Sequence, residues 1–390
     1  MSFSRARAGR IGLLVAAALV FALAFSKFAA RATSPGFLIG SSPAPAERRE
    51  SPRYRSLEVS HGKTPFAHSA TAVELPGRGL LAFWYAGSRE GASDSVILQS
   101  QFDAAAGSWS DERTVIDRST LESALQRSIR KIGNPTTIRD REGRLWLFFV
   151  SASIGGWAGS AVTMMRSEDG GRSWSAPRRL VTSPFLNIST LVKGAPFLYD
   201  DGSIGLPVYH ELIGKFGELL RLDGDGRVLA KQRLAWGKDS LQPVILPRSA
   251  NEALGLMRYA GNPPARVLVF RTVDGGLTWS APAKSELPNP NSGIDALRLD
   301  ASRLLLAFNN REASRDNLSL ACSDDDGRAW RVVHAVEDAR AGSSAEYSYP
   351  WLLGAQDGSI HLLYTVDKKS IRHVSFNRAW LEERLREKLR

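Results

Sequence analysis

Three segments of the chain share the pattern Ser/Thr-x-Asp-x-Gly-x-x-Trp, and this repeat constrains the fold more than any other feature. The copies span residues 167–174, 272–279 and 323–330, and weaker copies end at Trp109 and cover residues 222–229. Hydroxyl and carboxylate oxygens suit a tight turn because they accept backbone N–H groups, and the glycine permits positive φ. We therefore interpret the motif as a structural turn whose tryptophan packs between repeated units.

A second repeat has the same period. Six segments combine a polar or proline-containing head, an apolar run, a turn and a second apolar strand, which is the pattern of a β-hairpin. They begin at His68, Asn134, Ala195, Gln242, Asp295 and Tyr349. In four of them the tryptophan of the motif or its weaker copy follows 41, 40, 37 and 35 residues after the head. About four strands in roughly 50 residues make one propeller blade, so we predict an all-β, six-bladed β-propeller.

This interpretation divides the chain into four parts. Residues 1–32 contain three arginines followed by an apolar run, which is typical of a signal peptide or signal anchor. We expect residues 33–54 to be a flexible linker, residues 55–377 the propeller and residues 378–390 a short C-terminal helix. The apolar run is shorter than the roughly 20 residues of a spanning helix, so a cleaved leader and an inner-membrane anchor through residues 11–26 both remain open. In either case we expect export, to the periplasm or out of the cell.

The net charge of +11 does not indicate a nucleic-acid partner. Five of the positive charges lie in residues 1–35, which contain no acidic residue, and the rest are spread thinly without a Lys/Arg run. Phosphate binding needs a clustered basic patch, whereas a mildly basic surface suits anionic glycans. The single cysteine, Cys322, excludes an internal disulfide, and without CxxC spacing we expect no structural zinc site.

The repeated motifs resemble the Asp boxes of the bacterial sialidase (neuraminidase)-like, BNR-repeat glycosidase family, and the resemblance covers residues 60–376. Asp boxes also occur in other propellers, so they indicate the fold more strongly than the function. In this family arginines grip the sugar carboxylate, a tyrosine paired with a glutamate attacks the anomeric carbon, and an aspartate is the general acid/base. The resemblance implies neither a metal nor an organic cofactor.

The first and fourth blades supply three of the residues that the resemblance implies. Arg89 and Asp94 match the second arginine and the acid/base aspartate, whereas His68 stands in place of the first arginine. In the fourth blade Arg258 matches an arginine of the family, whereas Gln242 replaces the glutamate.

The fifth and sixth blades supply the remaining two residues. Arg315 matches the third arginine, and Tyr347, followed by Ser348, matches the nucleophile. The alternative is that Tyr347 packs inside its strand and that Tyr349 is the exposed tyrosine.

The two departures leave the mechanism open. Gln242 cannot act as a base, so Tyr347 would need activation by another carboxylate, for which Glu346, Glu211 and Asp295 are candidates. Alternatively, His210, Glu211 or Asp295 activates water and the enzyme inverts configuration.

Repeat position alone adds further candidates, because equivalent sites on the blades converge at one end of the ring. On this ground we expect the same axial cleft to hold Asn134, Lys193, His210, Glu211, Asp295 and Asn310.

Together these patterns predict an exported sialidase-like exo-glycosidase that removes a terminal acidic sugar, sialic acid or a related sugar, from glycans. One alternative is a catalytically weak or inactive glycan-binding propeller, which the missing base would explain. Another is a hydrolase or lyase for a different acidic sugar.

Overall fold

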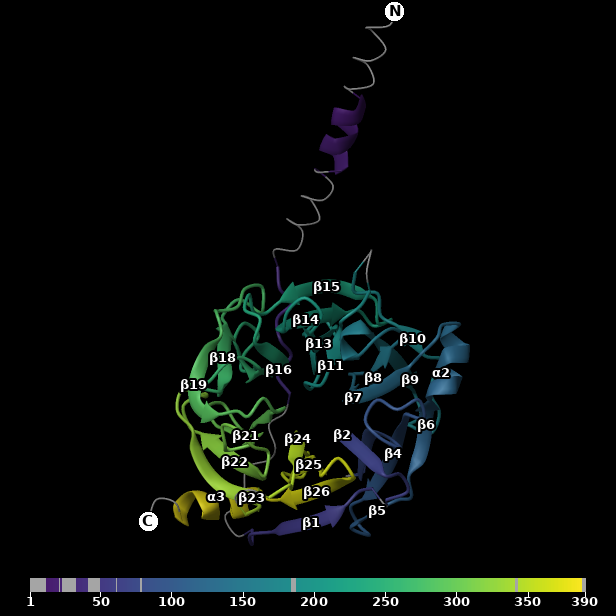
Figure 1. The fold of residues 1–390 in the computed structure, drawn as a ribbon. Helices are drawn as coiled ribbons and strands as arrows, with labels where there is room; N and C mark the ends of the chain where they lie inside the picture. The colour runs from purple at the N-terminus through teal and green to yellow at the C-terminus, as the bar shows by residue number, and fades with distance from the viewer. Residues whose placement is uncertain are drawn as a thin grey trace, which may run out of the picture.

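Hydrogen bonding joins the strands into six antiparallel sheets arranged as a ring (Figure 1). The computed structural model describes residues 12–20, 22, 33–40, 50–60, 62–77, 79–183, 187–340 and 343–387. In each sheet the first strand of the hairpin repeat lies innermost, as the labels β2, β7, β16 and β24 around the centre of Figure 1 show. The predicted six-bladed β-propeller is confirmed.

The first three blades carry the N-terminal half of the ring. Blade 1 consists of β2 (Phe66–Leu75), β3 (Gly79–Gly87), β4 (Val96–Asp103), β5 (Ser108–Trp109) and β6 (Arg113–Asp117). Blade 2 consists of β7 (Lys131–Arg139), β8 (Leu145–Ala152), β9 (Ser160–Ser167) and β10 (Arg178–Arg179). Blade 3 consists of β11 (Leu191–Val192), β12 (Phe197–Leu198), β13 (Ile204–His210), β14 (Phe216–Leu222) and β15 (Val228–Arg233).

The last three blades complete the ring. Blade 4 consists of β16 (Ser240–Pro247), β17 (Ala253–Tyr259), β18 (Arg266–Thr272) and β19 (Ala283–Pro288). Blade 5 consists of β20 (Asp295–Arg298), β21 (Leu304–Phe308), β22 (Asn317–Ser323) and β23 (Arg331–Asp338). Blade 6 consists of β24 (Tyr347–Gly354), β25 (Ile360–Val366), β26 (Ser370–Phe376) and the N-terminal β1 (Tyr54–Glu58).

The ring is closed by its two ends. Strand β1 pairs antiparallel with β26, from Tyr54 opposite Phe376 to Glu58 opposite Arg372, so the outermost strand of the last blade comes from the start of the chain. This pairing removes the free edge that a linear array of sheets would leave.

In the described part of the chain helices are few and short. A helix α2 (Arg118–Leu125) links blades 1 and 2, a 3₁₀ turn η1 (Trp157–Gly159) follows β8, and α3 (Arg378–Glu387) docks Trp380 and Leu385 on blades 5 and 6. Residues 12–20 are helical, but none of the helices in the described parts of the chain combines the length and apolarity needed to span a membrane. The rest of the predicted leader, apart from residue 22, and residues 388–390 of the predicted C-terminal helix lie outside the described residues.

The Asp boxes form the turns that the sequence predicts. In blade 4, Asp274 accepts the N–H of Thr278 at 2.9 Å and the hydroxyl of Thr272 at 2.8 Å, and Gly276 has a φ of 85°. The tryptophan at the end of this motif, Trp279, packs on Phe270. The motif therefore acts as a structural turn that stabilises the blade.

Residues 33–40, within the predicted linker, lie against the ring. Phe37, only 2% exposed, packs on Phe197 and Tyr199, and its N–H donates to Ala250 in the β16–β17 turn at 2.8 Å. Leu38 lines a hollow together with residues of blades 2 to 6. This segment, the N-terminal strap, thus lies across the axis at the end where the turn between β16 and β17 and the Asp box of blade 4 lie.

A chain of buried histidines joins blade 6 to blade 1. Trp109 Nε1 donates to His373 Nδ1 at 3.2 Å, and His373 Nε2 lies 2.9 Å from His361 Nδ1. An indole N–H can only donate, so neutral His373 carries its proton on Nε2 and donates it to His361. Burial lowers the pKa of His361 to about 4 and that of His373 to about 3, so both are neutral at pH 7.

This pair predicts a loss of stability in mild acid. Because the folded pKa values lie below the ordinary 6.5, protonation favours the unfolded chain, and the stabilisation present near neutrality declines as the pH falls below about 6.5. Replacing one histidine, as in His373→Gln, should reduce the slope of unfolding free energy against pH by up to about 1.4 kcal/mol per unit. Urea unfolding of both chains across this range measures the slope, and equal slopes would contradict the prediction.

Candidate functional site

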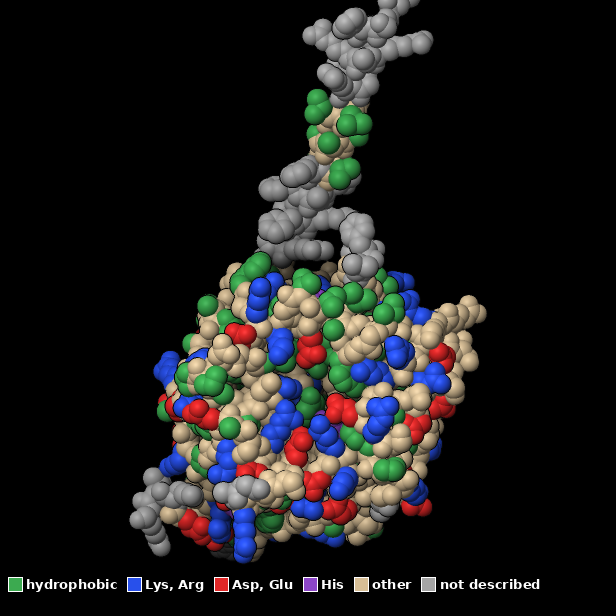
Figure 2. All heavy atoms as spheres, in the orientation of Figure 1, with side chains coloured by type: hydrophobic (Ala, Val, Ile, Leu, Met, Phe, Trp, Pro, Cys, Tyr) green, Lys and Arg blue, Asp and Glu red, His purple; other side chains and the backbone are tan. Residues whose placement is uncertain are grey.

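A cavity of about 210 Å³ opens at the end of the ring axis opposite the strap. Its walls come from the heads of inner strands and from the ends of the strands next to them. The lining residues are His68, Tyr85, Glu90, Asn134, Trp157, Leu191, Tyr209, Glu211, Arg258, Arg315, Tyr349 and Lys368. On the face of the ring that Figure 2 shows, basic and acidic side chains are interspersed.

Four inner strands break their own pairing beside this axial cavity, and two of the residues at the breaks, Asn134 and Tyr349, line it. The register shifts within β2, β7, β16 and β24, and the residues at the break have left-handed backbones. They are Ser69 (φ 57°), Asn134 (φ 44°), Gln242 (φ 53°) and Tyr349 (φ 55°). Such a bulge re-aims a side chain that a regular strand would leave on a blade face, and non-glycine residues pay for this conformation in strain, which is typical of functional sites.

Two arginines converge in the axial cavity through one asparagine. Arg258 Nε donates to Asn291 Oδ1 at 2.7 Å, and Arg315 donates to the backbone carbonyl of Asn291 at 2.7 Å. Arg315 also pairs with Glu346 at 3.0 Å, whereas Arg258 has no carboxylate within ion-pair distance among the described residues. A guanidinium held without an anionic partner is suited to bind a planar carboxylate.

A tyrosine hydroxyl lies beside Arg258. Tyr349 OH accepts Gln242 Nε2 at 3.1 Å and Arg258 Nη1 at 3.4 Å. Gln242 does not line the cavity itself, but its side chain hydrogen-bonds three residues that do. They are Tyr349, Arg258 and Tyr209. Two donors directed at one phenolic oxygen stabilise negative charge on it.

Tyr347 lies elsewhere. Its ring packs toward Tyr364 and the core between blades 5 and 6, and burial together with Glu337 raises its pKa. In an uninterrupted strand Tyr347 and Tyr349 would share a face, but the left-handed Tyr349 breaks the alternation. Of the two tyrosines weighed from the sequence, the structure brings Tyr349 into the axial cavity and not Tyr347.

Two carboxyl groups reach the axial cavity. Glu211 follows β13, and burial raises its pKa against the opposing influence of Arg258, Lys215 and Lys131. Glu90 lies in the loop after β3 and forms an ion pair with Lys368 at 3.0 Å. A carboxyl whose pKa is raised is suited to donate a proton near neutral pH.

His68 lines the wall beside Tyr349, with 4.3 Å between their ring centroids. Burial lowers its pKa well below the ordinary value, an effect that Lys368, Arg315 and Arg258 reinforce. His68 is therefore neutral and does not replace the cation of the family's first arginine.

Lys193 and Asp295 are buried beneath the axial cavity rather than lining it. Lys193 Nζ donates to the carbonyls of Ile294 at 2.5 Å and Pro350 at 2.8 Å, and Asp295 accepts the N–H of Leu352 at 2.7 Å. Burial lowers the pKa of Lys193 to about 8 and raises the pKa of Asp295. The charge of each residue partly offsets the pKa shift that burial causes in the other. The pair holds the inner strands together.

Besides Tyr347, Gln242, Lys193 and Asp295, four more predicted site residues do not line the axial cavity. Arg89 is exposed, and Asp94 accepts the backbone N–H and hydroxyl of Ser88, both at 3.0 Å, in an exposed turn. His210 stacks on Phe216, and Asn310 is not a lining residue. By contrast, His68, Asn134, Glu211, Arg258 and Arg315 all line the axial cavity as predicted.

Sequence reasoning missed Asn291, Lys368, Tyr85 and Tyr209. A signal for Tyr349 was present, because Asn134-Pro135, Gln242-Pro243 and Tyr349-Pro350 occupy the same repeat position. No comparable signal marks Lys368, which lies in the β25–β26 turn. In the part of the chain that the structure describes, no three His, Cys, Asp or Glu side chains are grouped so as to hold a metal ion.

Comparison with known proteins agrees with this architecture. The model of the BNR repeat-like domain family matches residues 78–362. No curated protein is similar enough in sequence to count as a match.

Solved structures share the fold at low sequence identity. A protein of unknown function from Dyadobacter fermentans has a TM-score of 0.67 at 15% identity, with 83% of this chain and 99% of that chain covered. The Hadza microbial sialidase Hz136 has a TM-score of 0.66 at 14% identity, with 82% and 68% covered. The NanB sialidase of Streptococcus pneumoniae has a TM-score of 0.64 at 11% identity, with 82% and 69% covered.

Proposed function

Because the chain belongs to the BNR repeat-like domain family and has a sialidase-like fold, we propose that it is an exo-glycosidase that removes a terminal acidic sugar from glycans. Sialic acid or a related sugar with a carboxylate at the anomeric carbon is the proposed substrate. The observation that carries this proposal is the convergence of Arg258 and Arg315 on a cavity beside the Tyr349 hydroxyl.

The arginines bind the carboxylate and so place the anomeric carbon near Tyr349. An anionic carboxylate nucleophile would be repelled by the sugar's own charge, whereas a phenol is not. In the retaining course, Tyr349 oxygen bonds to the anomeric carbon while the bond to the leaving oxygen breaks. The carboxyl of Glu211 protonates the leaving oxygen, and its carboxylate then deprotonates the water that releases the sugar.

The phenolic proton needs an acceptor other than Gln242, whose amide has no basic atom. His68 is held neutral by burial, and its ring lies against that of Tyr349. We assign it the role of this acceptor: burial and the neighbouring cations Lys368, Arg315 and Arg258 oppose its protonation, and the carboxylate of the bound sugar offsets those cations when the imidazolium forms.

Gln242 also supports a second candidate, a propeller that binds acidic glycans without cleaving them. Only donors contact the Tyr349 hydroxyl among the described residues, and no carboxylate does. Equilibrium binding of a sialoside by a wild-type chain that shows no turnover supports this candidate over the enzyme.

The tyrosine assignment predicts a contrast between two conservative variants. Tyr349→Phe should reduce hydrolysis of an aryl sialoside by about 10³-fold or more, because it removes the nucleophile. Tyr347→Phe, which removes a hydroxyl outside the axial cavity, should leave the rate within about twofold. Release of the aryl group is followed by absorbance, and an inactive Tyr347→Phe chain with an active Tyr349→Phe chain would contradict the assignment.

The role of Glu211 predicts the pH dependence of turnover. A general acid must be protonated, so turnover declines as the pH rises through its pKa, and burial shifts that decline upward from the ordinary value of 4.5. Glu211→Gln should slow turnover of a poor leaving group far more than that of a nitrophenol and should remove the alkaline limb. Rates for both leaving groups across pH test this, and an unchanged alkaline limb contradicts it.

We further propose that the chain is exported and held at a membrane by its N-terminal apolar run. The strap leaves the ring at the end opposite the axial cavity, an arrangement that would direct the cavity away from the membrane. Fractionation of cells expressing the full chain should find it in membranes, with the propeller accessible to protease from the exported side. Recovery in the cytosol contradicts the proposal.

A further inference from the structure

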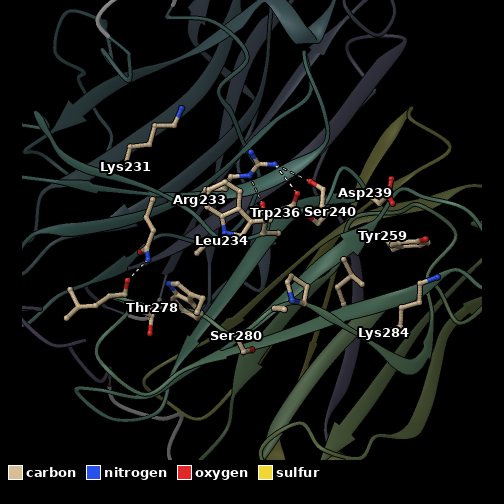
Figure 3. Close-up of a pocket in the computed structure, with 18 residues that line it drawn as sticks. Lys231, Arg233, Leu234, Trp236, Asp239, Ser240, Tyr259, Thr278, Ser280 and Lys284 are labelled. Atoms are coloured by element: carbon tan, nitrogen blue, oxygen red, sulfur yellow. Dashed lines mark hydrogen bonds between the residues drawn. The ribbon is translucent and has the colours of Figure 1, made fainter. Parts of the chain in front are cut away.

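A cleft of about 910 Å³ lies on the flank of the ring between blades 3 and 4 (Figure 3). Its walls come from β15, the β15–β16 connection, the end of β17 and the segment that follows the Asp box of blade 4. None of its lining residues lines the axial cavity. This flank cleft is therefore a separate feature of the molecule.

The flank cleft is where the repeat departs from its own pattern. The equivalent cleft between blades 1 and 2 is smaller, about 410 Å³, and there Trp174 Nε1 donates to Gln99 Oε1 at 3.1 Å. In blade 3 the position equivalent to Gln99 is Leu219. Ile97 pairs with Tyr85 in blade 1 and Gly217 pairs with Tyr209 in blade 3, and Gln99 and Leu219 each lie two residues further along the strand. The corresponding Trp279 finds no hydrogen-bond partner for its indole N–H among the described residues. An apolar residue has thus replaced the amide that ties the tryptophan in the other cleft.

One wall of the flank cleft presents an exposed aromatic ring. Trp236 is 84% exposed, on the connection from β15 to β16. Arg233 Nε donates to the Ala235 carbonyl at 2.6 Å, and its guanidinium lies 3.7 Å from the Phe216 ring centroid and 5.0 Å from that of Trp236. Arg233 therefore holds the connection that displays Trp236. A tryptophan left so exposed beside a cleft is unusual for a residue without a partner.

Positive charge is distributed along the same cleft. Lys231, Arg233 and Lys284 line it, against one carboxylate, that of Asp239. Lys231 is paired with Glu218 at 3.0 Å, but Arg233 and Lys284 have no carboxylate within ion-pair distance in the described parts of the chain. Lys284 Nζ donates to the Pro264 carbonyl at 2.8 Å and lies 4.2 Å from the centroid of the Tyr259 ring. Figure 3 shows Lys231 and Lys284 toward opposite ends, with Arg233 and Trp236 between them.

We propose that the flank cleft binds an internal stretch of an acidic oligosaccharide chain. One sugar ring stacks on Trp236, and carboxylates of the same oligosaccharide chain pair with Arg233 and Lys284. The apolar C–H face of a sugar suits an aromatic wall, acidic groups suit unpaired cations, and a volume of this size is typical of ligand clefts. The proposal rests on the proposed function, since it assumes that the axial cavity acts on the same class of glycan.

A nucleic acid fits this cleft less well. Single strands are bound through successive aromatic side chains along a continuous basic groove, whereas this cleft offers one exposed tryptophan and two cations without a carboxylate partner among the described residues. Binding at two places on one glycan raises the effective concentration of chain ends at the axial cavity. The flank cleft would thereby favour polymeric over small substrates.

The test measures binding of two acidic polymers, polysialic acid and polygalacturonate, to the full chain, with dextran as the neutral control. Trp236→Ala and Lys284→Ala should each weaken binding of at least one acidic polymer by about tenfold, the scale of one lost stacking or charge contact. The matched control is Arg172→Ala, which removes an exposed cation from the equivalent cleft between blades 1 and 2 and should leave binding unchanged. Thermal unfolding of each variant confirms that it is folded.

Binding that is equal in wild type, Trp236→Ala and Lys284→Ala overturns the inference, as does a loss of the same size in Arg172→Ala. Equal binding of dextran, or of single-stranded DNA with the same dependence on Trp236, also overturns it. Turnover of an aryl sialoside by the wild-type chain is measured in parallel. Polymer binding that depends on Trp236 without any turnover supports the flank cleft and contradicts the proposed function, whereas turnover without that dependence does the reverse.

Discussion

The axial cavity depends on one backbone constraint, the left-handed residue that interrupts the inner strand at its head. In four blades this break carries the side chain of Ser69, Asn134, Gln242 or Tyr349 out of the regular alternation. Each non-glycine residue in this conformation costs on the order of 1 kcal/mol or more. The cost is tolerated because the rest of each strand is hydrogen-bonded within its sheet and buried between neighbouring blades. The regular packing of the blades thus stabilises the strained backbone at the strand heads.

The same end of the ring concentrates the electrostatic features. Asn291, itself left-handed with a φ of 54°, accepts from Arg258 through its side chain and from Arg315 through its backbone. One residue thus sets the positions of two guanidinium groups that come from different blades. Burial keeps His68 neutral and raises the pKa of Glu211. The result is a small hollow with a fixed positive wall, a phenol and a carboxyl group that can hold a proton.

Sequence periodicity predicted the ring, because hairpin heads and Asp boxes recur at nearly constant offsets. Repeat position also placed Asn134 and Glu211 in one cavity, since equivalent positions on blades converge, and the family resemblance placed His68, Arg258 and Arg315 there. Periodicity could not distinguish Tyr347 from Tyr349, because both side chains would lie on the same face of a regular strand. Only the bulge at Tyr349 separates them.

Arg89 and Asp94 show a different limit of sequence reasoning. They lie in the loop after β3, where repeat position no longer fixes direction, and the loop turns Glu90 inward instead. Lys193 and Asp295 converge near the axis as expected, but burial places them under the cavity floor. Spacing along a chain fixes which blade end a residue occupies, whereas depth and direction follow from packing.

The account rests on the hydroxyl oxygen of Tyr349 being the atom that bonds to the anomeric carbon of the sugar. The direct test is to incubate the wild-type chain with a fluorinated sialosyl fluoride, which slows release of a glycosyl intermediate. The labelled chain is then digested, and mass spectrometry of the peptides locates the bond. The account predicts a single glycosyl adduct on the peptide that contains Tyr349, at the hydroxyl of that residue. Turnover of the reagent with no adduct, or an adduct on Tyr347 or on a carboxylate, would contradict it.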